Sequence, residues 1–156
     1  MDKERLMEKA VQVAHENVLS NHGGPFGAII VKNGEIIGMG RNEVTATNDP
    51  TAHAEVQAIR EACSKLNTFQ LSDCEIYTSC EPCPMCLGAI YWARPKAVYY
   101  ACTKEDAARV GFDDQFIYDQ IALPAESRSI PFLQIFPANG NLPFSAWEQS
   151  QNRIDY

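Results

Sequence analysis

Two kinds of segment are missing from the sequence: those that cross a membrane and those that join separate domains. No apolar run approaches the roughly 20 residues of a membrane-spanning helix, and no stretch has the composition of a linker or a low-complexity tract. The first residues, MDKERLMEKAVQVAHE, have neither the apolar centre nor the small-residue cleavage site of a secretory signal. With 156 residues, 46% of them hydrophobic, we expect one globular domain, residues 1–156, in the cytoplasm.

Positive charge is also scarce. The chain has 13 Lys and Arg residues against 20 Asp and Glu residues, so its formal net charge is -7 at pH 7. Proteins that follow a nucleic-acid backbone neutralise its phosphates with clustered Lys and Arg, and no such cluster stands out in this sequence. We therefore expect neither a stable nucleic-acid partner nor a membrane partner.

The hydrophobic pattern of the first half predicts two helices and a β-hairpin. Apolar residues recur at helical spacing in KERLMEKAVQVAHENVLS and again in NDPTAHAEVQAIREACSKL, where a helix should begin close to His53. Between these segments, two β-rich runs flank Asn33 and Gly34, a pair that accepts the positive φ angles of a tight turn. We expect two antiparallel strands there.

The second half continues with a strand, a helix and another strand. CEIYTS is typical of a buried strand, CPMCLGAIYWA of a helix entered through Pro84, and KAVYYAC of the next strand, an order that implies a parallel crossover. Farther along, KEDAARVGF is a candidate short helix, IPFLQIF (130–136) a candidate strand and PFSAWEQSQNRI a candidate terminal helix. The whole pattern predicts an α/β fold in which helices cover a mixed sheet.

Three of the six cysteines lie within TSCEPCPMC, residues 78–86, for which disulfide, redox and metal-binding interpretations are open. Without an export signal, a disulfide framework is less expected than metal or catalytic thiols. Cys83 and Cys86 are three residues apart on one predicted helix, so both face one side near its first turn, where the helix dipole favours thiolate. Such a pair suits a soft divalent ion such as zinc, which normally takes four ligands.

The sequence HAE, residues 53–55, offers partners for that ion. His53 and Glu55 stand at a helix start, where both side chains can reach one site. Three ligands, His53, Cys83 and Cys86, would leave one coordination position for water, whose pKa zinc lowers toward neutrality. Glu55 could accept the proton of that water and then act as a general acid, which is the chemistry of hydrolytic deamination at an amidine-like carbon.

Together, HAE and PCPMC match the H-x-E and P-C-x-x-C signature of zinc nucleobase deaminases. Over essentially the whole chain, the sequence resembles bacterial guanine deaminases of the cytidine/deoxycytidylate deaminase-like zinc deaminase family. The segments that carry this resemblance are GGPFGA, NDPTAHAE, TSCEPCPMCLGAIYWARPKAV, GFDD and the final tyrosine. It implies a three-layer α-β-α fold with a five-stranded mixed sheet, one zinc ion per chain, and conversion of guanine to xanthine and ammonia.

The resemblance also implies roles for individual residues. It implies zinc ligation by His53, Cys83 and Cys86. It implies proton transfer by Glu55 and assistance to the leaving amine by Asp114. The residues that it implies for binding the purine are Phe26, Asn42, Ala54 through its backbone, Trp92 and Tyr156.

The C-terminal segment, residues 140–156, has two open interpretations. Bacterial guanine deaminases that resemble this chain exchange such segments within a homodimer, so that each covers the partner's pocket, and Tyr156 matches the residue that closes it. Apolar Phe144, Trp147 and Ile154 could anchor an exchanged segment. The alternative is a terminal helix that packs on its own subunit.

Several of these residues also have a purely structural interpretation. Cys80 would close a four-ligand site and leave no position for water. Phe26 and Trp92 are aromatic residues of the kind that fill cores. Asn42 is suited to stabilising a turn, and Asp114 to a solvated loop.

Other functions remain open besides guanine deamination. A tRNA adenosine deaminase shares the metal and the glutamate, although the acidic chain and the extra C-terminal segments disfavour it. A zinc-stabilised binding module would need closure by Cys80, and a thiol redox enzyme would give His53 and Glu55 no role. Among small molecules, guanosine, other aminopurines and pteridine-like rings present amidine edges related to that of guanine.

Overall fold

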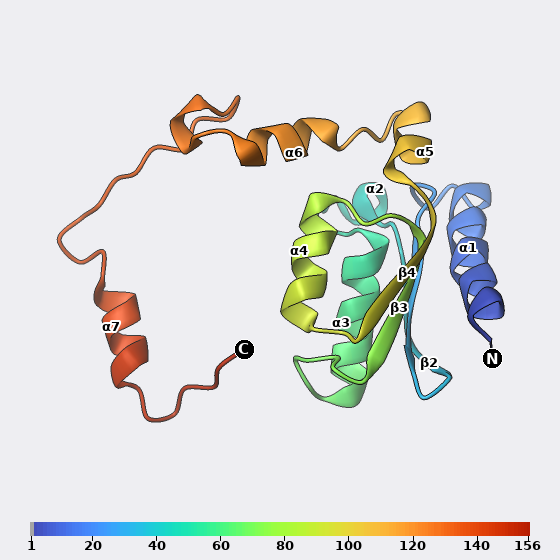
Figure 1. The fold of residues 1–156 in the computed structure, drawn as a ribbon, viewed down its shortest axis with the longest axis horizontal. Coiled ribbons are helices and arrows are strands. Elements are labelled where there is room, and N and C mark those ends of the chain that lie inside the picture. The colour runs from blue at the N-terminus through green and yellow to red at the C-terminus, as the bar shows by residue number, and fades with distance from the viewer. Residues whose placement is uncertain (1) are drawn as a thin grey trace. The chain divides into compact units, whose positions relative to one another are not determined.

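The chain divides into two compact units in the computed structural model, which describes residues 2–156. The first unit ends at Asp114, and the second is Gln115–Tyr156 (Figure 1). All strands of the described chain belong to the first unit. Among the described helices, none is long and apolar enough to cross a membrane.

A four-stranded sheet forms the centre of the first unit. Its strands are β1 (Gly27–Lys32), β2 (Glu35–Arg41), β3 (Cys74–Cys80) and β4 (Ala97–Cys102), in the order β2-β1-β3-β4. β1 pairs antiparallel with both β2 and β3, whereas β3 and β4 are parallel. The sheet is therefore mixed, as the sequence predicts.

The connections between strands also follow the sequence pattern. Asn33 and Gly34 join β1 to β2 with φ angles of 51° and 78°, which confirms the predicted hairpin turn. Helix α4 (Pro84–Ala93) lies between the parallel strands β3 and β4 in the chain, which confirms the predicted crossover.

Helices cover both faces of the sheet (Figure 1). Helix α1 (Lys3–Leu19) packs against one face, where it forms an apolar cluster with Ile29 and Val31 of β1. Helices α3 (Ala54–Leu66) and α4 pack against the other face, in a cluster that contains Ala28 and Ile30 of the same strand. Alternate residues of β1 thus face opposite helix layers, so the strand is buried on both sides. The predicted α/β class, with helices flanking the sheet, is confirmed.

The shorter helices connect or follow these layers. Helix α2 (Val44–Thr47) precedes α3, and α5 (Lys104–Arg109) follows β4 as predicted. The second unit contains α6 (Gln115–Ala122), the 3-10 helix η1 (Ala125–Ser127) and α7 (Leu142–Gln149). Helix α7 begins one residue before the segment predicted as a terminal helix, residues 143–154, and ends within it.

The expected fifth strand is wrong: the sheet has four strands, and residues 130–136 form no strand. These residues have a β-like composition, but they belong to the second unit, whose described elements are all helical. A strand needs a neighbour whose backbone N–H and C=O groups complete its ladder. No strand of that unit is present among the described residues to supply them, so composition alone does not produce a strand there.

Two glycines in β2 allow α3 to lie directly on the sheet. A Cβ atom at Gly40 would stand 2.0 Å from the carbonyl oxygen of Ala54, and one at Gly38 would stand 2.7 Å from that of Ala58. The facing residues of α3, which include Ala58 and Ala62, are themselves small and fully buried. Backbone therefore packs against backbone, and this contact fixes the position of the first turn of α3 relative to the sheet.

We predict that Gly40→Ala lowers the free energy of unfolding, because its Cβ atom must push the α3 backbone away from the sheet. Overpacking of a core typically costs about 1–3 kcal/mol. Urea denaturation of the wild-type and variant proteins measures the difference. Gly88→Ala in α4 is the matched control, since a Cβ atom there meets nothing within 4 Å, and alanine favours a helix over glycine. Equal midpoints for Gly40→Ala and Gly88→Ala would contradict this packing argument.

Candidate active site and metal centre

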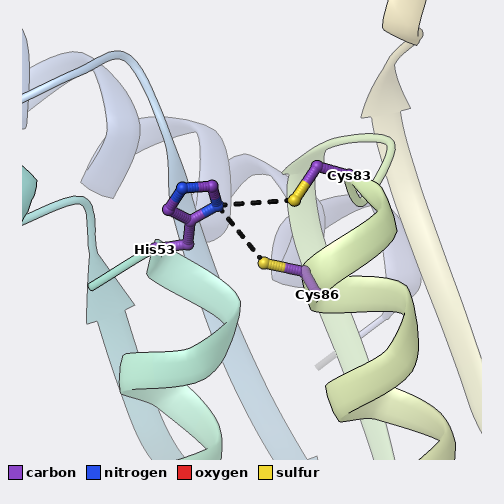
Figure 2. Close-up of side chains that lie close together, drawn as sticks. All are labelled: His53, Cys83 and Cys86. Carbon is purple, nitrogen blue, oxygen red and sulfur yellow. Dashed lines mark hydrogen bonds between the residues drawn. The ribbon is translucent and has the colours of Figure 1, made fainter. Parts of the chain in front are cut away.

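The starts of two helices bring the predicted ligands together. His53 is the N-cap of α3 and Cys83 the N-cap of α4, and both have extended backbone angles. Pro84 occupies the first turn of α4, where a missing N–H costs no helical hydrogen bond. The side chain of His53 reaches from α3 toward the two cysteines at the start of α4 (Figure 2).

The three side chains form one compact donor set. Nδ1 of His53 lies 3.5 Å from Sγ of Cys83 and 3.5 Å from Sγ of Cys86. All three donor atoms lie within 4.8 Å of one another. Two ligands bound tetrahedrally to zinc through nitrogen and sulfur are separated by about 3.6 Å. The observed separations therefore fit a single zinc ion.

Protons are distributed unequally over the three donors. A hydrogen bond from the Cys86 thiol lowers the pKa of Cys83 to about 4. The same hydrogen bond, together with burial, raises the pKa of Cys86. A hydrogen bond with Cys83 raises the pKa of the His53 imidazole. Zinc binds cysteine as thiolate and histidine as neutral imidazole, so it must displace protons from these donors, and zinc affinity should fall as the pH is lowered.

Glu55 is a buried carboxyl beside this donor set. It lies in the first turn of α3, is 6% exposed, and hydrogen-bonds the Cys86 thiol. Burial raises the pKa of the Glu55 carboxyl, because water no longer solvates its charged form. A carboxylate with a raised pKa is a better proton acceptor near neutral pH. The site therefore combines three metal-binding donors with one proton carrier.

Cys80 lies outside the donor set. Its thiol is 7% exposed and donates a hydrogen bond to the carbonyl oxygen of Thr103 at 3.5 Å. Burial raises the pKa of this thiol to about 11, so it stays protonated. The donor atoms that lie within 4.8 Å of one another are those of His53, Cys83 and Cys86 and do not include Cys80, so the alternative in which Cys80 closes a four-ligand site has no structural support.

Three of the residues expected to bind a purine lie near the start of α3 or in the loops beside it. The half-buried ring of Phe26 forms a T-shaped pair with the ring of Phe112, with centroids 5.0 Å apart. Asn42 is 9% exposed, and its Oδ1 accepts a hydrogen bond from the N–H of Val44 at 3.2 Å, so its turn-stabilising role is confirmed. Ala54 is the first residue of α3, where a backbone N–H has no acceptor within the helix.

The other three expected residues have different surroundings. Asp114 is half-buried, and burial followed by the negative charge of Cys83 raises the pKa of its carboxyl, which places it within electrostatic reach of the donor set. Trp92 is 63% exposed and stands six residues after Cys86, about 9 Å farther along α4. Tyr156 belongs to the second unit and is 69% exposed. Roles for all three in binding or catalysis stay predictions.

Sequence reasoning missed two residues that support this site. Phe112 lies in the GFDD segment and contacts Phe26, but nothing in the pattern distinguishes it from a surface aromatic residue. Asn17 is 1% exposed and holds two backbone segments together. Its signal was available, since it falls on the same face of α1 as the buried residues Leu6, Ala10 and Ala14.

Comparison with known proteins shows the family of the chain. The cytidine and deoxycytidylate deaminase zinc-binding region, as a family profile, matches residues 1–102. Guanine deaminase of Bacillus subtilis (strain 168) is 58% identical over 156 residues, 100% of both chains. An X-ray structure of guanine deaminase from Bacillus subtilis has a TM-score of 0.98 at 58% identity, covering 100% of this chain and 99% of that one.

A different deaminase matches a smaller part of the chain. The tRNA-specific adenosine deaminase of Aquifex aeolicus (strain VF5) is 45% identical over 101 residues, 65% of this chain and 66% of that protein. The family profile is that of a zinc-binding deaminase region, and His53, Cys83 and Cys86 form a single group that could hold the ion.

We predict that replacing either Cys83 or Cys86 by Ala removes zinc, because two remaining donors cannot hold the ion. Elemental analysis of the purified protein gives the zinc content per chain. Cys80→Ala is the matched control, since Cys80 lies three residues before Cys83 but its thiol is hydrogen-bonded to Thr103. This variant should keep one zinc per chain. Loss of zinc from the Cys80 variant would refute the three-ligand site.

Proposed function

The chain belongs to the cytidine and deoxycytidylate deaminase zinc-binding family, and we propose that it hydrolyses guanine to xanthine and ammonia. The observation that carries this proposal is the similarity to Bacillus subtilis guanine deaminase over the whole chain. That similarity includes residues 103–156, which the family profile does not cover. The match to the tRNA-specific enzyme leaves about a third of the chain unmatched, so a small purine base is the substrate favoured here.

The reaction replaces the exocyclic amino group of the ring by oxygen from water. When bound, zinc supplies Lewis-acid chemistry that makes water nucleophilic near neutral pH. The buried Glu55 carboxylate accepts one proton from the attacking water and transfers it to a ring nitrogen. It then carries the second proton to the departing amino group. The carbon–oxygen bond forms, the carbon–nitrogen bond breaks, and ammonia leaves.

The surroundings of the donor set suit a flat, polar ring. Phe26 offers an aromatic face or edge, and Asn42 and the backbone N–H of Ala54 offer polar atoms from adjacent segments. The segments that contain Asn42 and Ala54 are joined by a backbone hydrogen bond, which the N–H of Glu43 donates to the carbonyl oxygen of Ala52 at 2.9 Å. Asp114 is within electrostatic reach of Cys83, and its carboxylate would accept hydrogen bonds from the leaving amine. We assign Phe26, Asn42 and Ala54 to base binding and Asp114 to amine release.

Zinc-loaded protein should release ammonia from guanine faster than from guanosine, adenine, cytosine, cytidine or tRNA. Glu55→Gln should keep zinc and fold but lower guanine turnover by about 10²- to 10⁴-fold, since the amide keeps the shape of the side chain but carries no proton. Ammonia release and ring absorbance measure both effects.

Glu61→Gln, the same change at an exposed position of the same helix, is the control and should keep full activity. Faster turnover of cytosine or tRNA would reject guanine as the substrate. Near-normal guanine turnover by Glu55→Gln would exclude Glu55 as the proton carrier.

We further propose that the chain acts as one deaminase domain in a homodimer whose copies exchange residues 140–156. No residue of the second unit is buried, although many of its side chains are apolar. A chain segment that buries no apolar surface has little to stabilise it in water. A second copy would provide that surface, since exchange of an identical element is a low-cost route to a symmetric dimer. The exposed large apolar residues of the segment are Leu142, Phe144, Trp147, Ile154 and Tyr156.

In this arrangement, Tyr156 closes the partner's pocket and helps to exclude water from the reaction. Trp92 is exposed at the far end of α4. It would bind the base only if formation of the dimer brings it to a substrate pocket. The cytoplasmic location expected from the sequence stays a prediction.

Deleting Ile154, Asp155 and Tyr156 should depress guanine turnover without changing the zinc content, because the zinc ligands all lie in the first unit. Light scattering should find a dimer for the full chain. Full guanine turnover by the truncated protein would show that Tyr156 is no lid. A monomer at micromolar concentration would rule out exchange between copies.

A further inference from the structure

A single buried amide joins two loops beside the proposed substrate site. Asn17 lies near the end of α1 and is 1% exposed. Its Nδ2 donates hydrogen bonds to the carbonyl oxygen of Gly24 at 2.8 Å and to that of Asn42 at 2.9 Å. The two acceptors belong to segments that are far apart in the sequence, before β1 and after β2. The Asn17 amide therefore acts as a link between them.

The two linked segments are also bonded to each other through Phe26. The N–H of Phe26 donates to the carbonyl oxygen of Gly24 at 2.8 Å, and the N–H of Asn42 donates to the carbonyl oxygen of Phe26 at 3.2 Å. With the two bonds from Asn17, these bonds form a closed ring. The backbones of Phe26 and Asn42, both assigned to base binding, are members of this ring.

The orientation of the Asn17 amide follows from its partners. Two carbonyl oxygens can accept only from the NH₂ group, so turning the amide over would set its oxygen against both of them. The Oδ1 atom is buried and has no hydrogen-bond partner. A buried acceptor without a partner costs free energy. That cost is tolerated at this position, where the two donated bonds fix the adjacent loops.

Tight packing around Asn17 leaves the loop little freedom. The backbone carbonyl of Asn17 accepts hydrogen bonds from the N–H groups of His22 and Gly23. A Cβ atom at Gly23 would stand 2.3 Å from the carbonyl oxygen of Asn42. The loop can approach Asn42 this closely only because Gly23 has no side chain.

We propose that Asn17 is a positioning residue of the substrate site: its amide closes a hydrogen-bond ring that holds Phe26 and Asn42 in the geometry that receives the base. Asn17 acts through the Gly24 and Asn42 carbonyls. This inference rests on the proposed function, since it takes Phe26 and Asn42 as base-binding residues. Zinc binding does not depend on the ring, because its ligands lie on the other helices.

The test uses Asn17→Leu and Asn17→Asp in the full-length, zinc-loaded protein. Leu keeps the approximate size but donates nothing, and Asp sets a carboxylate against two carbonyl oxygens. For both, the KM for guanine should rise by at least about tenfold, with a smaller change in kcat and one zinc per chain retained. Hydrogen exchange at the N–H groups of Phe26 and Asn42 should accelerate, whereas exchange in β3 should not. If Asn17→Asp does not fold, Asn17→Leu decides the outcome.

Gln12→Glu is the matched control, because it makes the same amide-to-carboxylate change at an exposed position of the same helix; its KM should equal that of the wild type. An unchanged KM in Asn17→Leu, with or without faster exchange, would overturn the positioning role and leave Asn17 as a residue of stability only. Wild-type protein that releases no ammonia from guanine would instead reject the proposed function, and unchanged exchange at Phe26 and Asn42 would then overturn the ring as well.

Discussion

The meeting of two helix starts, His53 on α3 and Cys83 on α4, is the constraint on which the site depends. Both residues are N-caps, so their side chains leave the helix ends rather than the helix sides. Nδ1 of His53 can then lie 3.5 Å from each of two sulfur atoms. The sheet fixes the position of His53 in this arrangement, because α3 packs directly on β2 at Gly38 and Gly40, which have no side chains. A small displacement of α3 would separate the imidazole from the thiols and move Glu55 with it.

Two buried polar side chains, Glu55 and Asn17, lie in the first unit with this centre. Glu55 is withdrawn from water, which raises the pKa of its carboxyl and makes it a base suited to neutral pH. The Asn17 amide is also buried, and it donates hydrogen bonds to the carbonyl oxygens of Gly24 and Asn42. In the function proposed for this chain, Glu55 transfers protons and Asn17 positions the loops. The metal-binding donors lie at the starts of α3 and α4, whereas the Asn17 amide belongs to α1, so Asn17 variants should leave zinc binding measurable.

Local chemistry made much of the first unit predictable from the sequence. Asn33 and Gly34 accept the positive φ angles of the hairpin, and the start of α3 at His53 follows from the spacing of apolar residues after it. The ligand cluster was predictable because the spacing of Cys83 and Cys86 sets both thiols on one face of a helix start.

The features that the sequence did not predict correctly depend on residues that are distant in the chain. Residues 130–136 have the composition of a strand, but a strand exists only where another strand pairs with it, and composition does not contain that information. The position of Asn17 on the buried face of α1 could be predicted, but its role could not, because that role depends on the two carbonyls that it meets in the fold.

The most direct test of the account is a zinc titration of metal-free protein, with guanine turnover followed at each addition. The account predicts no turnover without zinc, a rise in proportion to the zinc bound, and a plateau at one zinc per chain. Guanine turnover by the metal-free protein, or a plateau at a different ratio of zinc to chain, would contradict it.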